Sequence, residues 1–161
     1  MMFAFEMMLL GPVYLLAIAI PLARIDIREH RLPNRLVLPT FPIALVGQLL
    51  VDWQLGMWGL TIVALATSAI AFGFALLINR TGVLGMGDVK LIAAIAFVLG
   101  WFSPIAPAWA LFYALTAATV VVLAMLVVRK THLKAHIPFG PYLMFGFAVS
   151  CLQLLGTPLD G

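Results

Sequence analysis

Long apolar segments separated by short polar connections dominate the chain. Six of them approach the length that a helix needs to cross a bilayer, roughly 20 residues. They are Met7–Ala23, Leu36–Val51, Met57–Ile78, Gly87–Phe102, Ala106–Val128 and Phe139–Leu155. The pattern predicts an all-α, polytopic integral membrane protein with six transmembrane helices, because helices satisfy their own backbone groups in lipid. The connections are too short to leave room for a soluble domain.

Composition agrees with this pattern. The chain is 65% hydrophobic and 9% charged, against roughly 25% charged residues in soluble domains. Its net charge of +3 is too small to indicate a nucleic-acid partner and instead suits basic loops beside membrane lipid. The single cysteine, Cys151, excludes a disulfide within the chain and a cysteine zinc site. The first residues include Glu6 and lack the basic start of a signal peptide.

Charge also predicts the orientation of the segments. All basic residues fall in three connections: after the first segment, around the start of the fourth, and after the fifth. The connections on the other side of the membrane, together with the two chain ends, hold Glu6, Asp52 and Asp160 and no basic residue. Basic connections stay in the cytoplasm, so we expect the N-terminus to be external. The basic residues are Arg24, Arg28, Arg31, Arg35, Arg80, Lys90, Arg129, Lys130 and Lys134. Interfacial anchors are expected near the external boundary at Trp53, Trp58, Trp101 and Trp109.

Two aspartates lie on the basic side of this arrangement. Asp26 follows the first segment, and Asp88 closes the sequence Gly85-Met-Gly87-Asp88. An even number of segments separates them, so both belong to the same face. Carboxylates are costly at a membrane edge, and a converging pair indicates acid–base chemistry. A helix dipole favours an anion at the start of a helix and disfavours one at its end, so we expect Asp88 to be the base and Asp26 the acid.

Each of these residues also has an interpretation without catalysis. Asp26 could be a solvated charge neutralised by neighbouring arginines, and Asp88 a favourable charge in a first helical turn. Lys90 either extends toward the headgroups or keeps Asp88 ionised. His132 and His136 have the spacing of a helical metal pair, but zinc needs three or four ligands, so we expect no metal site.

Three motifs at the basic side carry a family resemblance. They are Asp26-Ile-Arg-Glu-His-Arg-Leu-Pro33-Asn34, Gly85-Met-Gly87-Asp88-Val-Lys90 and Pro138-Phe-Gly-Pro-Tyr142. In this order and at a membrane edge, they resemble the type IV prepilin peptidases. The resemblance implies an aspartic endopeptidase of the inner (cytoplasmic) membrane that needs no cofactor. Its partner would be a prepilin or pseudopilin precursor, whose basic leader it removes at the cytoplasmic face.

The resemblance also implies roles for individual residues. Asp26 and Asp88 would be catalytic and would activate a water molecule between them. Gly85, Gly87, Lys90 and Pro33 would support the site. The remaining motif, Phe139-Gly140-Pro141, receives no role from the resemblance.

One difference from longer members changes the expected activity. Those proteins carry an N-terminal cytosolic segment with paired Cys-x-x-Cys motifs, which is linked to methylation of the new N-terminus. Because the chain has one cysteine and no such segment, we expect a short form without methyltransferase activity. Residues 1–161 would then form a single membrane-embedded peptidase domain.

Two other classes of function remain open. A presenilin-type intramembrane protease would place a tyrosine before the first aspartate and carry a Pro-Ala-Leu motif. Here Ile25 precedes Asp26, and the tripeptide is absent. A non-enzymatic membrane module or ion pathway would place ionisable groups at several depths, whereas the centres of the apolar segments are uncharged.

Overall fold

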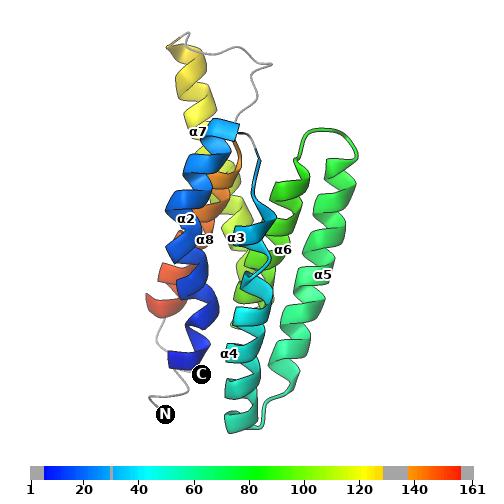
Figure 1. Cartoon of the computed structure of the whole chain (residues 1–161). Helices are drawn as coiled ribbons and strands as arrows, with labels where there is room; N and C mark the ends of the chain where they lie inside the picture. Colours follow the sequence, from blue (N-terminus) through cyan, green and yellow to red (C-terminus); the bar gives the residue numbers. More distant parts are fainter. Residues whose placement is uncertain (1–5, 30, 129–137, 157–161) are drawn as a thin grey trace.

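The computed structural model describes residues 6–29, 31–128 and 138–156, with side chains through Leu154. All regular structure in these residues is helical, which confirms the all-α prediction (Figure 1). The helices are α2 (Leu10–Glu29), α3 (Asn34–Val37), α4 (Thr40–Leu55), α5 (Gly59–Asn79), α6 (Met86–Gly100), α7 (Ala106–Val127) and α8 (Gly140–Gly156).

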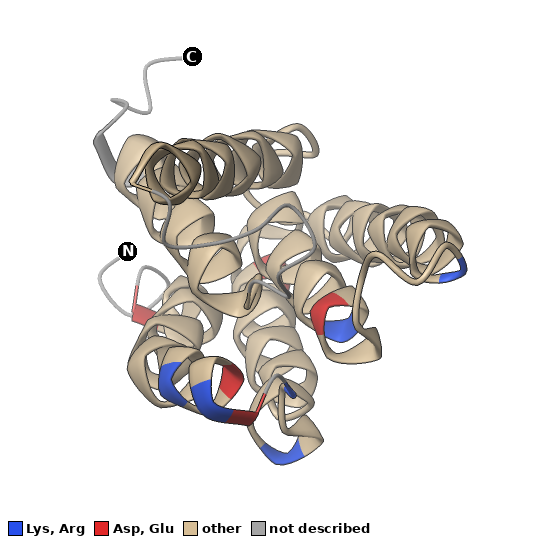
Figure 2. Ribbon diagram, turned by 90° about the horizontal axis from the view of Figure 1, so that it is seen from above, with Lys and Arg blue, Asp and Glu red and all other residues tan. Residues whose placement is uncertain are grey.

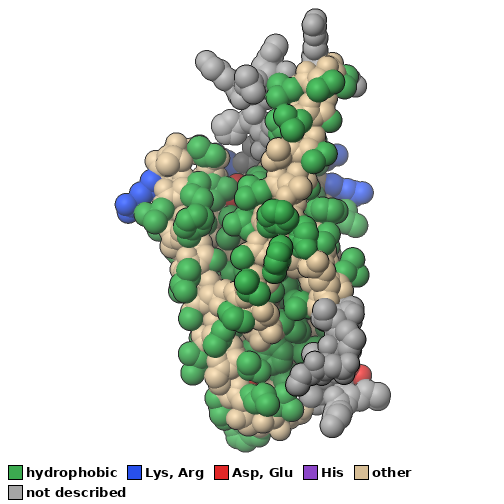
Figure 3. All heavy atoms as spheres, turned by 180° about the vertical axis from the view of Figure 1, so that it is seen from behind, with side chains coloured by type: hydrophobic (Ala, Val, Ile, Leu, Met, Phe, Trp, Pro, Cys, Tyr) green, Lys and Arg blue, Asp and Glu red, His purple; other side chains and the backbone are tan. Residues whose placement is uncertain are grey.

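Helix α6 lies at the centre of the bundle. It contacts α2, α3, α4, α5, α7 and α8, and every side chain from Ala93 to Gly100 is buried. The surrounding helices present apolar side chains outward, including Ile70 and Phe74 on α5 and Phe112 on α7. Hydrophobic side chains accordingly cover much of the face seen in Figure 3. An apolar exterior of this kind is suited to lipid contact.

The prediction of six transmembrane helices is not confirmed. Four helical stretches are long and apolar enough to cross a membrane: Leu10–Glu29, Asn34–Leu55, Gly59–Asn79 and Ala106–Val127. Helix α6 has 15 residues, about 22 Å of helix against a hydrocarbon thickness of roughly 30 Å. Helix α8 has 17 residues and is apolar but short. Because the neighbouring helices shield α6 from the surroundings of the bundle, α6 does not need an apolar surface as long as the hydrocarbon layer is thick.

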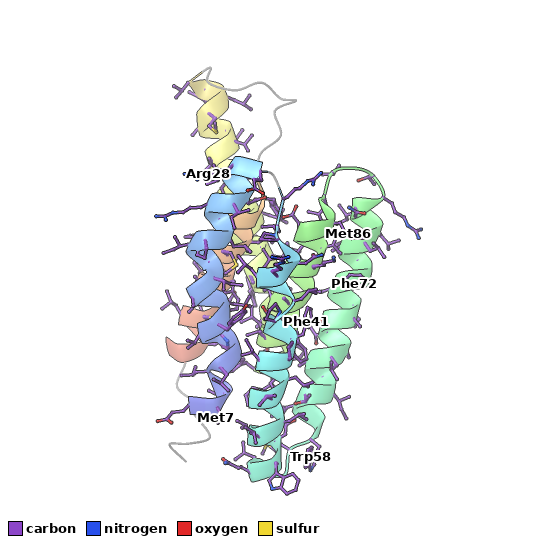
Figure 4. The ribbon with its side chains drawn as sticks, in the orientation of Figure 1. Met7, Arg28, Phe41, Trp58, Phe72 and Met86 are labelled. Carbon is purple, nitrogen blue, oxygen red and sulfur yellow. The ribbon has the colours of Figure 1, made fainter. Side chains whose placement is uncertain are left out.

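Helix α2 extends beyond its predicted end at Ala23. It continues to Glu29 and includes Pro21 in its interior, so the proline does not end the helix. Asp26 therefore lies on a helix and not in a connecting loop. Met7 and Trp58 lie toward one end of the bundle, whereas Arg28 and Met86 lie toward the opposite end (Figure 4). We call the end with Arg28 and Met86 the pocket end.

Asp52 joins three helices at the end opposite the pocket end. Its side chain is fully buried and accepts hydrogen bonds from the Thr61 backbone N–H (3.1 Å) and from Trp101 Nε1–H (2.9 Å). Trp101 was predicted to be an interfacial anchor, but it is buried and donates its indole N–H to this carboxylate. The other three predicted anchors, Trp53, Trp58 and Trp109, are exposed.

We expect Asp52→Ala to lower the free energy of unfolding by about 3 kcal/mol, because two buried N–H groups lose their acceptor. Thermal unfolding in detergent measures the change. Glu6→Ala is the matched control, since Glu6 is an exposed acidic side chain next to Met7, which lies toward the same end. Equal stability of the two variants would contradict the structural role of Asp52.

Candidate active site

A pocket with a volume of about 310 Å³ opens at the pocket end, where α2 ends and α6 begins. It brings together Asp26, Gly85, Gly87 and Asp88, four residues that the sequence singled out. The lining also includes Arg31, Leu32 and Met86, which sequence analysis did not select for this site. Figure 2 views this end of the bundle and shows basic and acidic residues of several segments around it. The two aspartates therefore share one pocket.

Asp26 is buried on α2, with 5% of its surface exposed. Its Oδ2 accepts a hydrogen bond of 2.8 Å from the backbone N–H of Gly140, the first residue of α8. The interpretation of Asp26 as a solvated charge is therefore wrong. The same hydrogen bond gives the Phe139-Gly140-Pro141 motif a direct contact with the pocket.

Asp88 lies in the first turn of α6 and is held by the glycine motif before it. Its Oδ2 accepts a hydrogen bond of 3.2 Å from the backbone N–H of Gly85, the N-cap residue of α6. Its Oδ1 is buried and has no hydrogen-bond partner in the part of the chain that the structure describes. An acceptor buried in this way is costly. Oδ1 is consequently the oxygen of Asp88 that would hold a proton or a water molecule.

The environment of Asp88 makes it easier to protonate than an ordinary carboxyl. Asp88 stands at the loop-facing end of α6, which is not one of the four helices long enough to span a membrane. Burial raises its pKa from 3.8 to about 6, the charge of Asp26 acts in the same direction, and the Gly85 N–H opposes them. The helix dipole alone favours the opposite direction. Burial and the charge of Asp26 outweigh it.

Lys90 has a different contact from either of its predicted ones. Its Nζ donates a hydrogen bond of 2.9 Å to Asn34 Oδ1. Asn34 is the first residue of α3, and Pro33 before it occupies the N-cap position with an extended backbone. The Pro33 carbonyl accepts the backbone N–H groups of Leu36 and Val37. The Lys90 hydrogen bond thus links α6 to the start of α3, which the Pro33 carbonyl caps.

Leu32 is the point where the three sequence motifs meet. A Cβ on Gly87 would lie 2.8 Å from Leu32 Cβ, and one on Gly140 would lie 3.1 Å from Leu32 Cδ2. Leu32 itself is buried. Neither glycine has room for a side chain beside it. In the sequence, the one sign of this role is that Leu32 is an apolar residue inside a charged connection.

Several predicted features fall outside the described residues. His132 and His136 are among them, and so are the basic residues Arg129, Lys130 and Lys134. Within the described ranges, no group of three or more His, Cys, Asp or Glu side chains could hold a metal ion.

Comparisons with known proteins extend over nearly all of the described chain. Residues 13–155 match the type IV leader peptidase family. A prepilin leader peptidase/N-methyltransferase of Aeromonas salmonicida is 32% identical over 137 residues, which cover 83% of this chain and 46% of that protein. The protein of the same name from Dickeya chrysanthemi is 32% identical over 152 residues, covering 92% and 52%. The chain spans about half the length of these curated relatives. No solved structure matches it.

Proposed function

The chain belongs to the type IV leader peptidase family, and we propose on this basis that it is a membrane aspartic endopeptidase. Its reaction would be removal of the basic leader from prepilin or pseudopilin precursors at the cytoplasmic face of the inner membrane. The observation that carries this proposal is the single pocket lined by Asp26 and Asp88. Two carboxyls in one pocket can share a proton, as acid–base hydrolysis of an amide requires.

The contacts of the two carboxyls support a division of labour. When two carboxyls share one proton, the carboxyl that holds it is the acid and the other is the base. Asp88 is the carboxyl with the raised pKa, so it is the one that holds the proton. In the proposed reaction Asp26 is therefore the base and Asp88 the acid, the reverse of the assignment that the dipoles alone predicted.

The proposed reaction needs only water and these two groups. Asp26 takes a proton from water as its oxygen attacks the scissile carbonyl carbon, while Asp88 donates a hydrogen bond and then its proton to the carbonyl oxygen. Asp26 then gives the proton it took from water to the leaving nitrogen as the C–N bond breaks. Asp88 takes back a proton from a hydroxyl of the intermediate as the new carboxyl group forms, so both aspartates return to their starting protonation states. The reaction involves neither a covalent intermediate nor a cofactor.

Cleavage of a precursor by the purified chain tests this function. The full chain in detergent is incubated with a prepilin that carries a basic leader before an apolar helix, and mass spectrometry maps the products. We expect one cut, between the leader and the apolar helix. Added S-adenosylmethionine should leave the product mass unchanged, since we propose peptidase activity and not the N-methyltransferase activity that the relatives' names include. A cut inside the apolar helix would favour the presenilin-type alternative, and no cut would contradict the proposal.

A further inference from the structure

We infer that Gly140 is a positioning residue for Asp26. Its amide holds one carboxyl oxygen, and its missing side chain lets α8 approach α2 closely enough to do so. This inference rests on the proposed function for its catalytic meaning. It assigns a role to the Phe139-Gly140-Pro141 motif, which the family resemblance left without one.

The close approach at Gly140 is the first part of the argument. Asp26 Oδ2 lies 2.8 Å from the Gly140 nitrogen. A Cβ at residue 140 would lie 2.8 Å from Oδ2 and 3.2 Å from Cγ of the same carboxyl. Such distances are too short for unstrained contacts, so any side chain here would displace the carboxyl group.

Space, and not backbone conformation, is what requires glycine at this position. Among the described glycines, positive φ angles occur at Gly56 and Gly82. Gly140 has no such angle and begins a regular helix. An L-residue could therefore adopt its backbone conformation, and the obstacle to a side chain is the Asp26 carboxyl itself.

The amide donor is fixed in place by the packing of α8. Helix α8 packs along α7 and also against α2. Gly146 on α8 contacts the backbone of Ala110 on α7, and a side chain there would meet Ala110 O. Leu32 also lies beside Gly140, since a Cβ at residue 140 would be 3.1 Å from Leu32 Cδ2. A donor held on a packed helix positions a catalytic group more precisely than a donor on a loop.

Holding one oxygen fixes the plane of the Asp26 carboxyl relative to the pocket that it shares with Asp88. Catalysis by a carboxyl pair depends on this geometry, because small displacements of a reacting group can cost about 100-fold in rate. Substrate binding depends on it much less. The positioning role therefore predicts a change in kcat without a matching change in KM.

Gly140→Ala tests the inference. We expect kcat for leader removal to fall at least about tenfold, with KM unchanged. Gly73→Ala is the neutral control, because a Cβ on Gly73 of α5 meets nothing within 4 Å. Gly47→Ala is the structural control: a Cβ on Gly47 of α4 would meet Met7 O, away from the pocket, so it should lower the thermal midpoint of unfolding while kcat per folded molecule stays near that of the wild type. Wild-type kcat in Gly140→Ala would overturn the inference.

A stability measurement tests the contact without any activity. Gly140→Ala is expected to lower the thermal midpoint in the wild-type chain and to lower it much less in an Asp26→Ala background, where the obstructing carboxyl is gone. Equal effects in the two backgrounds would overturn the inference even if the chain cleaved no prepilin. Failure of the wild-type chain to cleave, with the coupling present, would instead count against the proposed function alone.

Discussion

Replacing either Asp26 or Asp88 by asparagine is expected to lower kcat for leader removal by about 10² to 10⁴-fold. Asparagine has nearly the size of aspartate and can still accept the N–H of Gly140 or Gly85 through its amide oxygen. It cannot take or give a proton in the reaction. The loss should therefore fall on the chemical step while the chain still folds and inserts. Cleavage by each purified variant, normalised to folded protein, measures the change.

Asp52→Asn is the matched control for this pair. Asp52 is also a buried aspartate with two hydrogen bonds, but it lies at the end of the bundle opposite the pocket. We expect Asp52→Asn to keep kcat near that of the wild type, even if the fold loses some stability. Cleavage at the wild-type rate by either Asp26→Asn or Asp88→Asn would remove the two-aspartate mechanism.

The rate of leader removal is expected to fall as pH rises above about 6. The proposed acid, Asp88, must carry its proton, and its pKa lies at about 6. Above that pH the protonated fraction decreases by about tenfold for each pH unit. A kcat–pH profile of the wild-type chain tests this, with Asp52→Asn giving the same profile. A rate that rises steadily from pH 6 to pH 8 would show that Asp88 is not the acid.

The same pKa has a consequence for stability. In the unfolded chain Asp88 has its ordinary pKa of 3.8, and folding raises it to about 6. Its contribution to stability is thus fully present below pH 3.8 and is lost as pH rises through about 6. At neutral pH, Asp88→Asn removes the cost of burying the ionised carboxyl and should stabilise the fold by on the order of 2 kcal/mol. Asp88→Asn, although nearly inactive, would then unfold at a higher temperature than the wild type.

The helices and the two aspartates were accessible from sequence because their signals are local. Apolar segments located α2, α4, α5, α6, α7 and α8 to within several residues. Charge counting placed Asp26 and Asp88 on one side, and the structure has them in one pocket. Segment length was a poorer guide, because α6 is shielded by protein and can be short.

The contacts around the aspartates were not accessible from sequence. Leu32 stands out in the sequence only as an apolar residue inside a charged connection, and nothing there shows that it packs against two glycines distant in the chain. From sequence, Trp101 is interpreted as an interfacial anchor, and only the structure shows its hydrogen bond to Asp52. The proton affinity of Asp88 was misjudged for the same reason. The helix dipole is a local effect, whereas burial and the charge of Asp26 exist only in the folded bundle.

The contact between Gly140 and Asp26 bears on how the protein is made. The two aspartates are synthesised early, on α2 and α6, whereas the amide that holds Asp26 belongs to α8, which follows them in the chain. A nascent chain translated only through α7 carries both carboxyls without this support. Hydrolytic competence would then arise only when α8 docks against α2, so that a ribosome-bound intermediate or a product truncated before α8 would be kept from cutting other membrane proteins.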